Sequence, residues 1–391
     1  MNSSDASRAP RVAVAGLSAR LLAQSAARAG LDVVALDIFG DRDTREHAGM
    51  WFDIGGNGLS IDRARLYDAL EHAARLPRML GLIVTSGLEP LAGELSRAPR
   101  VPRFIGNGAQ AAAVRDPKRF FALLDEAGIA HPEVRFAPPA ARQDWLVKRS
   151  DGCGGTHIEW AEDVECAPPD AYFQRLAQGR SMSALFVAAR REAAVIGFAE
   201  QLTVAAGRLP FVHAGSLGPV QLPPETASRI VDAIDTIIWQ TDLTGLNSID
   251  FLLDGDTFSV LEINTRPSST MALYELAWPN TWPRGLIGAH LDACLHGELP
   301  RTLRTFANAP PLFAGQRVVF APGRFAVSRA FSDACFDDPA CHDVPLTGAS
   351  IEAGFPVCTM TAVAPAFSDL RDELDREHAR LLQRIATLSM P

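Results

Sequence analysis

Three residues with oxygen-bearing side chains lie close together in two neighbouring apolar runs of the sequence. Asp250 lies in the run NSIDFLL, and Glu262 and Asn264 lie in the run VLEINTRP. The turn at 254–256 between them predicts a β-hairpin, in which side chains two positions apart share one face. Magnesium prefers carboxylate and amide oxygens and completes its coordination with water and phosphates. The pattern therefore predicts a magnesium site that holds the phosphates of a nucleotide.

Arg266 continues the same face of the second run. It lies two positions after Asn264, so its guanidinium can neutralise an anion beside the metal. An ordinary hairpin with solvated acids is the alternative, and it would explain an isolated Asp and Glu equally well. The compact Glu-x-Asn-x-Arg pattern favours the metal site.

A second cluster combines a lysine with a glycine-rich turn. Lys148 ends the apolar run WLVK, and the following turn, RSDGCGGTH, carries Gly152, Gly154 and Gly155. Glycine N–H groups can close on phosphate oxygens, and a lysine on a strand supplies a fixed positive charge. The lysine precedes the glycines, whereas in a P-loop it follows them, so a P-loop is excluded. A flexible hairpin tip is the alternative.

An apolar strand–turn–strand segment further along offers a place for a purine. Residues 172–176 and 183–188 predict two strands around the turn 177–181, and Gln174 lies in the first of them. A purine requires an apolar slot with donors and acceptors at its edge, and such a segment can supply both.

The N-terminal residues predict a parallel sheet. An apolar strand at 11–15, a helix at 19–29 and a strand at 33–36 form a βαβ unit, followed by a helix at 61–76 and a strand at 80–85. The first turn lacks the Gly-x-Gly-x-x-Gly spacing, so a dinucleotide site is the weaker interpretation.

Glu89 lies just past the strand at 80–85. A residue at the carboxyl end of a strand in such a sheet can contact a ligand, but Glu89 also suits the first turn of a following helix, which is the more frequent role. Residues 116–128 and 223–239 predict helices, the first with Asp at its N-cap and Gly at its end. Residues 300–311 predict a linker.

The composition favours a globular protein with more than one domain. The chain has 391 residues, of which 47% are hydrophobic, and a formal net charge of -9. That charge argues against a nucleic-acid partner. No run reaches the ~18 apolar residues of a membrane span, and the polar N-terminus is unlike a signal peptide, so we expect a cytoplasmic protein without a membrane partner.

The cysteines indicate no further chemistry. The chain has six, scattered without close pairs, which predicts reduced thiols. Cys335 and Cys341 with His342 are a weak metal-site candidate. Catalysis by Cys153 and His157 is not favoured either, because the spacing places no partner beside them.

Taken in order, these motifs resemble those of the ATP-grasp superfamily of ligases over roughly residues 1–300. The resemblance implies phosphate contacts from Lys118, Lys148, Gly152, Gly154 and Gly155, with the glycines in a moving lid. It implies an adenine pocket at Gln174, magnesium ligands in Asp250, Glu262 and Asn264, and stabilisation of an acyl-phosphate transition state by Arg266. Arg180, after the hinge glycine, stands where many relatives carry a ribose-binding acid, so the resemblance implies that it contacts the nucleotide there.

The run EINTR resembles the biotin-carboxylase-like branch, and residues 343–359 resemble its small C-terminal domain. The expected fold class is α/β and α+β. The resemblance implies a Rossmann-like pre-ATP-grasp domain at 1–110, an ATP-grasp domain at 111–300 with a mobile lid at about 140–205, and a small C-terminal domain at 301–391.

The resemblance implies a ligase that uses ATP and Mg²⁺, with Mn²⁺ as an alternative ion. Its partners would be a small-molecule carboxylate and an amine, joined through an acyl phosphate, and it would form a homodimer. A carboxylase acting through carboxyphosphate uses the same residues and stays open, as does a nucleotide-binding protein without chemistry, which the intact metal ligands argue against. The chain also resembles carboligase-like proteins of bacterial methanopterin- or methanofuran-linked one-carbon metabolism, which would place the reaction in the biosynthesis of a one-carbon carrier cofactor.

Overall fold

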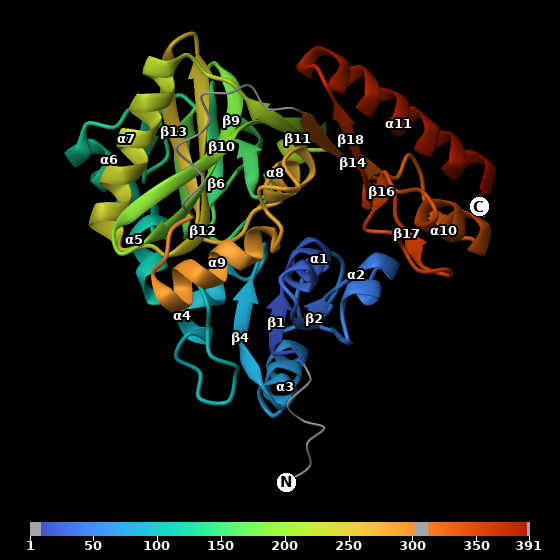
Figure 1. The fold of residues 1–391 in the computed structure, drawn as a ribbon. Coiled ribbons are helices and arrows are strands. Elements are labelled where there is room, and N and C mark those ends of the chain that lie inside the picture. Colours follow the sequence, from blue (N-terminus) through green and yellow to red (C-terminus); the bar gives the residue numbers. More distant parts are fainter. Residues whose placement is uncertain (1–8, 301–311, 389–391) are drawn as a thin grey trace.

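A parallel sheet forms the N-terminal part of the computed structural model, which describes residues 9–300 and 312–388. The strand order is β3-β2-β1-β4 (Figure 1). Its strands are β1 (Arg11–Ala15), β2 (Asp32–Asp37), β3 (Met50–Asp53) and β4 (Met79–Val84). The helices are α1 (Arg20–Arg28), α2 (Arg42–His47), α3 (Arg63–Ala74), the 3₁₀ turn η1 (Glu89–Leu91) and α4 (Ala92–Leu95). The predicted βαβ unit is confirmed, whereas α2 and β3 were not predicted.

Both faces of this sheet are covered. Val12 and Val14 pack into one cluster and Ala13 and Ala15 into another, so β1 is apolar on both sides. Continuous apolar runs of this kind are typical of buried parallel strands.

A small antiparallel sheet follows, in the order β5-β8-β6-β7. Its strands are β5 (Val134–Arg135), β6 (Trp145–Arg149), β7 (Ile158–Trp160) and β8 (Ala171–Arg175), with η3 (Ala161–Asp163) after β7. The preceding helices are η2 (Ala109–Ala111), α5 (Ala112–Arg115) and α6 (Pro117–Ala127). Helix α6 begins as predicted, because the Asp116 carboxylate accepts hydrogen bonds from two backbone N–H groups of its first turn, and it ends at Gly128 with φ of 66°.

The largest sheet has eight strands in the order β13-β12-β9-β10-β11-β14-β18-β16. The first five are β9 (Arg180–Ala189), β10 (Glu192–Ala206), β11 (Leu209–Val220), β12 (Gly245–Asp254) and β13 (Thr257–Asn264). The helices of this part are α7 (Pro224–Thr241), α8 (Met271–Ala277) and α9 (Gly285–His296). Ile230 and Ile234 of α7 pack with one face of β9, and Leu286 of α9 packs with the other. Helix α1 joins this second cluster, so the N-terminal sheet is anchored to the large sheet through α1 and α9.

Three of the C-terminal strands extend the large sheet, and two others pair with each other in a small separate sheet. The elements are β14 (Phe313–Phe320), β15 (Phe325–Ala326), α10 (Arg329–Phe336), β16 (Cys341–His342), β17 (Ser350–Ile351), β18 (Pro356–Ala364) and α11 (Phe367–Leu388). Strand β14 pairs with β11 over Gly215–Gly218, and α11 packs on β14 and β18 (Figure 1). The expected linker lies almost wholly outside the described residues.

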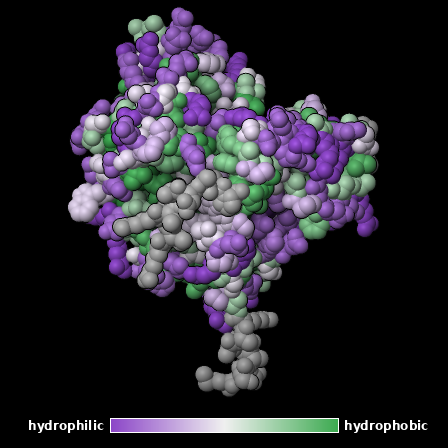
Figure 2. All heavy atoms as spheres, turned by 45° about the horizontal axis from the view of Figure 1, so that its top comes forward, coloured by the Kyte–Doolittle hydropathy of each residue, from purple (hydrophilic) through white to green (hydrophobic). Residues whose placement is uncertain are grey.

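Hydrophilic and hydrophobic residues are interleaved over the face drawn in Figure 2, and hydrophilic ones gather over the C-terminal unit. Among residues 9–300 and 312–388, no helix combines the length and apolar character needed to cross a membrane.

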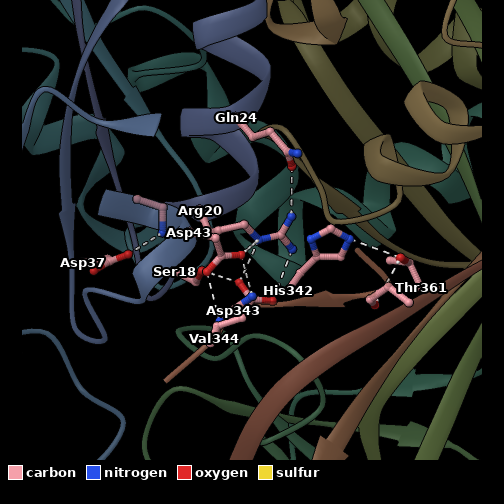
Figure 3. A network of polar contacts seen from close by, with 11 residues as sticks. Ser18, Arg20, Gln24, Asp37, Asp43, His342, Asp343, Val344 and Thr361 are labelled. Carbon is pink, nitrogen blue, oxygen red and sulfur yellow. Dashed lines mark hydrogen bonds and ion pairs between the residues drawn. The ribbon is translucent and has the colours of Figure 1, made fainter. Parts of the chain in front are cut away.

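A buried polar cluster joins the C-terminal unit to the N-terminal sheet (Figure 3). Arg20 donates from Nε and Nη2 to the two carboxylate oxygens of Asp343, at 3.0 and 3.2 Å. The Asp43 carboxylate accepts from the backbone N–H groups of Asp343 and Val344, at 2.8 and 3.0 Å. Burial raises the pKa of the Asp343 carboxyl, but the charge of Arg20 outweighs this and lowers it to about 2. We refer to this group, with Ser18, as the junction cluster.

Candidate functional site

The hairpin β12–β13 brings the predicted oxygen ligands to one face. Asp250 lies directly opposite Glu262, and Ser248 lies opposite Asn264. Residues directly opposite in an antiparallel pair point to the same side. The structure therefore brings together the three predicted ligands, and Arg266 lines the same cavity.

The Asp250 carboxylate is buried beside a second carboxylate, that of Glu262. Burial and, to a lesser extent, the charge of Glu262 raise the pKa of its carboxyl to about 6, and the charge of Arg266 opposes the rise. One oxygen, Oδ2, accepts a hydrogen bond from Asn264 Nδ2 at 3.0 Å. The other, Oδ1, is buried without a hydrogen-bond partner among the described residues.

These residues suit an open magnesium site, not a site in which protein ligands alone surround the metal. In the described part of the chain, no three His, Cys, Asp or Glu residues converge in a metal-binding arrangement. Two carboxylates, one amide and a free buried carboxylate oxygen are what a cation needs when water and phosphates complete its shell. The Asn264 Oδ1 accepts a hydrogen bond from Arg266 Nη2 at 3.2 Å. To bind a metal, this oxygen would have to use its second lone pair, or the amide would have to rotate.

Lys148 on β6 faces the two carboxylates. It is 4% exposed. Burial lowers the pKa of its ammonium group, and the charges of Glu262 and Asp250 oppose that shift. A buried ammonium group beside paired carboxylates is suited to binding phosphate oxygens.

The glycine loop after Lys148 is docked on β11. The backbone N–H of His213 donates to the Gly154 carbonyl at 3.0 Å. Gly155 has a φ of 76°, and a Cβ at this position would overlap the Phe211 carbonyl oxygen. Only glycine permits both the conformation and the close approach. The His157 ring also lies in the cavity wall, with its Nδ1 buried and unpaired among the described residues.

All of these groups line one cavity of about 550 Å³. Its apolar end is formed by Pro132, Leu146, Ile158, Leu176, Leu252 and Leu261. Gln174 lies there with 1% exposure, and no described residue pairs with its Nε2. An apolar slot with one open amide donor matches the purine slot predicted from the sequence.

Glu89 joins the N-terminal sheet to this site. Its Oε1 accepts from Arg266 Nε at 2.6 Å, and its Oε2 accepts from the Gly87 N–H at 2.7 Å. Burial raises the pKa of the Glu89 carboxyl, but the charges of Arg266 and Arg115 outweigh this and lower it. Glu89 lies in the first turn of a short helix, η1, which is the more frequent of the two roles considered for it. Its ion pair with Arg266 was not predicted from the sequence.

Three predicted residues do not line the cavity: Lys118, Gly152 and Arg180. Lys118 is exposed in the first turn of α6, with its ammonium 5.6 Å from the centre of the Phe136 ring. Arg180 points toward Glu200, 3.9 Å from its carboxylate, on the outer side of β9. Gly152 lies against the His157 side chain, which a Cβ at this position would overlap.

Arg115 is a cation that the sequence analysis missed. Its Nη2 donates to the Ser150 carbonyl at 2.9 Å, at the base of the glycine loop, and its charge acts on Glu89 and Cys153. No local pattern distinguished Arg115 from Lys118, because Arg115 ends α5 and only the packing of the helices brings it to the loop.

Residues 115–270 match the family model of the ATP-grasp domain. No curated protein matches the sequence. Among solved structures, the L-amino acid ligase from Bacillus licheniformis superposes with a TM-score of 0.69 at 13% identity, over 96% of this chain and 98% of that one. The N5-carboxyaminoimidazole synthase from Aspergillus clavatus, in complex with ADP and its ribonucleotide, gives 0.68 at 13% identity, over 97% and 100%.

The biotin carboxylase domain of the Hydrogenobacter thermophilus 2-oxoglutarate carboxylase, with MgADP and bicarbonate, gives a TM-score of 0.70 at 14% identity, over 94% and 89%. At these identities the likeness establishes the fold, which is the ATP-grasp fold expected from the sequence.

Proposed function

We propose, with the ATP-grasp domain of residues 115–270 as the premise, that this protein is an ATP- and Mg²⁺-dependent ligase that joins a carboxylate to an amine. The observation that supports this most is the convergence, in one cavity, of paired carboxylates, a buried lysine and a docked glycine loop. The L-amino acid ligase and the carboxylases with the same fold make activation of an acid by ATP the natural chemistry.

In the first step, a carboxylate oxygen of the substrate attacks the γ-phosphorus of ATP. The bond to the β,γ-bridging oxygen breaks, and ADP leaves, so the product is an acyl phosphate. Lys148 would offset negative charge on the transferring group, and Arg266 would bind the carboxylate being activated.

In the second step, an amine nitrogen attacks the acyl carbon. The carbon–oxygen bond to phosphate breaks, inorganic phosphate leaves, and the nitrogen gives up a proton to solvent. The loop with Gly154 and Gly155 would exclude water until this attack occurs, because water would hydrolyse the intermediate.

Asp250, Glu262 and the amide of Asn264 would hold magnesium, whose charge would offset that of the phosphates when it is bound. Gln174 and the apolar end of the cavity would hold the adenine. Arg115 would hold the base of the glycine loop through the Ser150 carbonyl, a role different from the phosphate contact expected of Lys118.

A carboxylase acting through carboxyphosphate is the second candidate, because a biotin carboxylase domain superposes as well as the ligase does. It would use the same residues on bicarbonate, so only the products separate the two. The proposed domains (1–110, 111–300 and 301–391), the homodimer and the link to one-carbon carriers remain predictions.

The test is Mg²⁺-dependent release of ADP and phosphate from ATP, with pools of carboxylic acids and amines, and with bicarbonate. We expect release that requires an acid and an amine together. Stimulation by bicarbonate alone would favour the carboxylase, and AMP with pyrophosphate would contradict the acyl phosphate.

Glu262→Gln tests the metal assignment. Loss of the second carboxylate should lower kcat by roughly 10²–10³-fold while nucleotide binding changes much less. Asp254→Asn, an exposed acid at the tip of the same hairpin, is the matched control and should keep wild-type turnover. Equal activity of Glu262→Gln and wild type would contradict the assignment.

A further inference from the structure

The proposed function leaves open what kind of molecule occupies the end of the cavity opposite the adenine slot. We propose that it is a small, unphosphorylated substrate with a single carboxylate, and that the Glu89–Arg266 pair selects against phosphorylated substrates. This inference rests on the proposed function and goes beyond it by naming the substrate class.

The cavity offers few positive charges. The lysine and arginine residues that line it in the described part of the chain are Lys148, Arg175 and Arg266. Lys148 faces the paired carboxylates at the metal site. Arg175 is at the adenine end, on β8 beside Gln174, and its guanidinium is 3.9 Å from Glu133. Arg266 is therefore the cation that remains for the second substrate.

Glu89 offsets the charge of Arg266. The ion pair measures 2.6 Å, and both side chains are buried, with Arg266 8% and Glu89 4% exposed. Coulomb interactions are strong where water is excluded, so the pair presents little net charge to a ligand. A phosphate monoester carries up to two negative charges and would lose its hydration here without a counter-charge, which is costly.

Arg266 can still bind one carboxylate. A guanidinium has five N–H donors. Three of them go to Glu89, Asn264 and the Pro267 carbonyl, which leaves one on each terminal nitrogen. Two parallel donors fit the two oxygens of a carboxylate.

The remaining wall is polar but uncharged. It includes the hydroxyl groups of Ser86, Ser268 and Thr270 and the imidazole of His213. Burial lowers the pKa of His213 to about 4, and the charge of Arg266 contributes, so the ring is neutral at physiological pH. Hydroxyl groups and a neutral imidazole can bind amines, amides and alcohols.

The size of the cavity limits the substrate as well. A volume of about 550 Å³ is what proteins use for one drug-sized ligand. A nucleoside triphosphate fills most of such a space. The second substrate is therefore on the scale of an amino acid or hydroxy acid.

The test compares matched pairs of acids in the ADP-release assay with the full-length protein. Serine and phosphoserine form one pair, and glycerate and 3-phosphoglycerate form another. Each acid is tested separately with the same equimolar pool of amines that carry no carboxylate, and further small acids and their phosphate esters are compared in the same way. We expect the unphosphorylated members to give at least about tenfold higher kcat/KM, since loss of one charge pairing is worth that much.

Each outcome bears on a different proposal. Stimulation by phosphate esters that equals or exceeds that of the free acids overturns this inference and leaves the ligase intact. Absence of stimulation by every acid and ester overturns both.

Glu89→Gln provides a second test. The amide keeps a hydrogen bond to Arg266 but removes the negative charge, so the preference should shift at least about tenfold toward the phosphate ester of each pair. Glu94→Gln is the control, because Glu94 is an exposed acid on the neighbouring helix α4 that pairs with Arg63. An unchanged preference in a folded Glu89→Gln protein would contradict the role given to Glu89.

Discussion

Arg20 at the junction cluster and Arg266 in the cavity each meet carboxylates from distant parts of the chain, but their surroundings differ. At the junction, all four carboxylate oxygens of Asp43 and Asp343 accept hydrogen bonds. In the cavity, four of the lining residues each keep a buried polar atom that no described residue satisfies: His157, Gln174, Ser183 and Asp250.

This difference separates a structural cluster from a binding site. A buried polar atom without a partner costs free energy of folding, so proteins rarely keep one without a reason. Several together in one cavity indicate that a ligand completes them. The saturated junction cluster has no such capacity, and its contribution is to fix the C-terminal unit against α1 and α2.

Arg20→Met should give the largest loss of stability. Removing this buried guanidinium leaves Asp43 and Asp343 without their positive partner, so the free energy of unfolding should fall by about 3–5 kcal/mol. Denaturant unfolding measures it. Arg42→Met, at the same junction but paired with the half-exposed Asp333, should lose only about 0–1 kcal/mol. Equal losses would mean that the two ion pairs do not differ as their burial suggests.

Gly155→Ala should affect the cavity without an equal effect on stability. The added Cβ would overlap the Phe211 carbonyl and hold the glycine loop away from β11, and misplacement of about 1 Å can lower turnover by roughly 10²-fold. Gly154→Ala is the control, since Gly154 also has a positive φ, 61°, but open space around it. ADP release by both variants is the measurement, and similar losses would show that backbone strain, not loop docking, is responsible.

Acid should destabilise both regions through their histidines. Burial is the main reason that the pKa values of His213 and His342 fall to about 4, and the neighbouring arginines, Arg266 and Arg20, add to it. The unfolded chain would take up these protons as the pH falls from about 6.5, so stability is complete above that pH and is lost progressively toward pH 4. Each histidine should contribute on the order of 1–2 kcal/mol of loss at pH 5.

Unfolding free energies at pH 7, 6 and 5 test this. His342→Gln should flatten the pH dependence and leave ADP release unchanged, whereas His213→Gln should flatten it and also alter ADP release, because only His213 lines the cavity. A pH dependence that is equally steep in wild type and in both histidine variants would refute the prediction.

The smallest effects should distinguish two cations near α6. Arg115→Met should lower kcat/KM for ATP by about tenfold, because Arg115 supports the glycine loop through Ser150. Lys118→Ala should change it by less than about twofold, since the side chain lies outside the cavity. A larger effect of Lys118 would restore the assignment made from the sequence.

Local patterns were sufficient to predict part of the site. The period of two in a strand placed Asp250, Glu262 and Asn264 on one face of a hairpin before their register was known. The cap at Asp116 and the terminal Gly128 likewise predicted α6 to within a residue. In both cases, the interactions that determine the structure lie within one helix or between two strands adjacent in sequence.

Other features depend on contacts between distant residues. Glu89 and Arg266 are 177 positions apart, so nothing near Glu89 indicates its partner. Lys118 and Arg115 are both basic residues beside the same cap, and only the packing of α6 decides which faces the loop. The pairing of β14 with β11 is also long-range, and no local pattern in either strand indicates the other as its partner.

The pairing of β14 with β11 also affects the solubility of the protein. Without β14, the backbone N–H and C=O groups of β11 over Gly215–Gly218 would form an open edge of the sheet. Open edges of this kind pair with other chains, so a fragment ending near residue 300 should self-associate. Strands β11 and β14 approach each other closely at Gly215, because a side chain there would overlap the carbonyl of Gln316. The C-terminal residues therefore protect the edge of the sheet that carries the proposed nucleotide site.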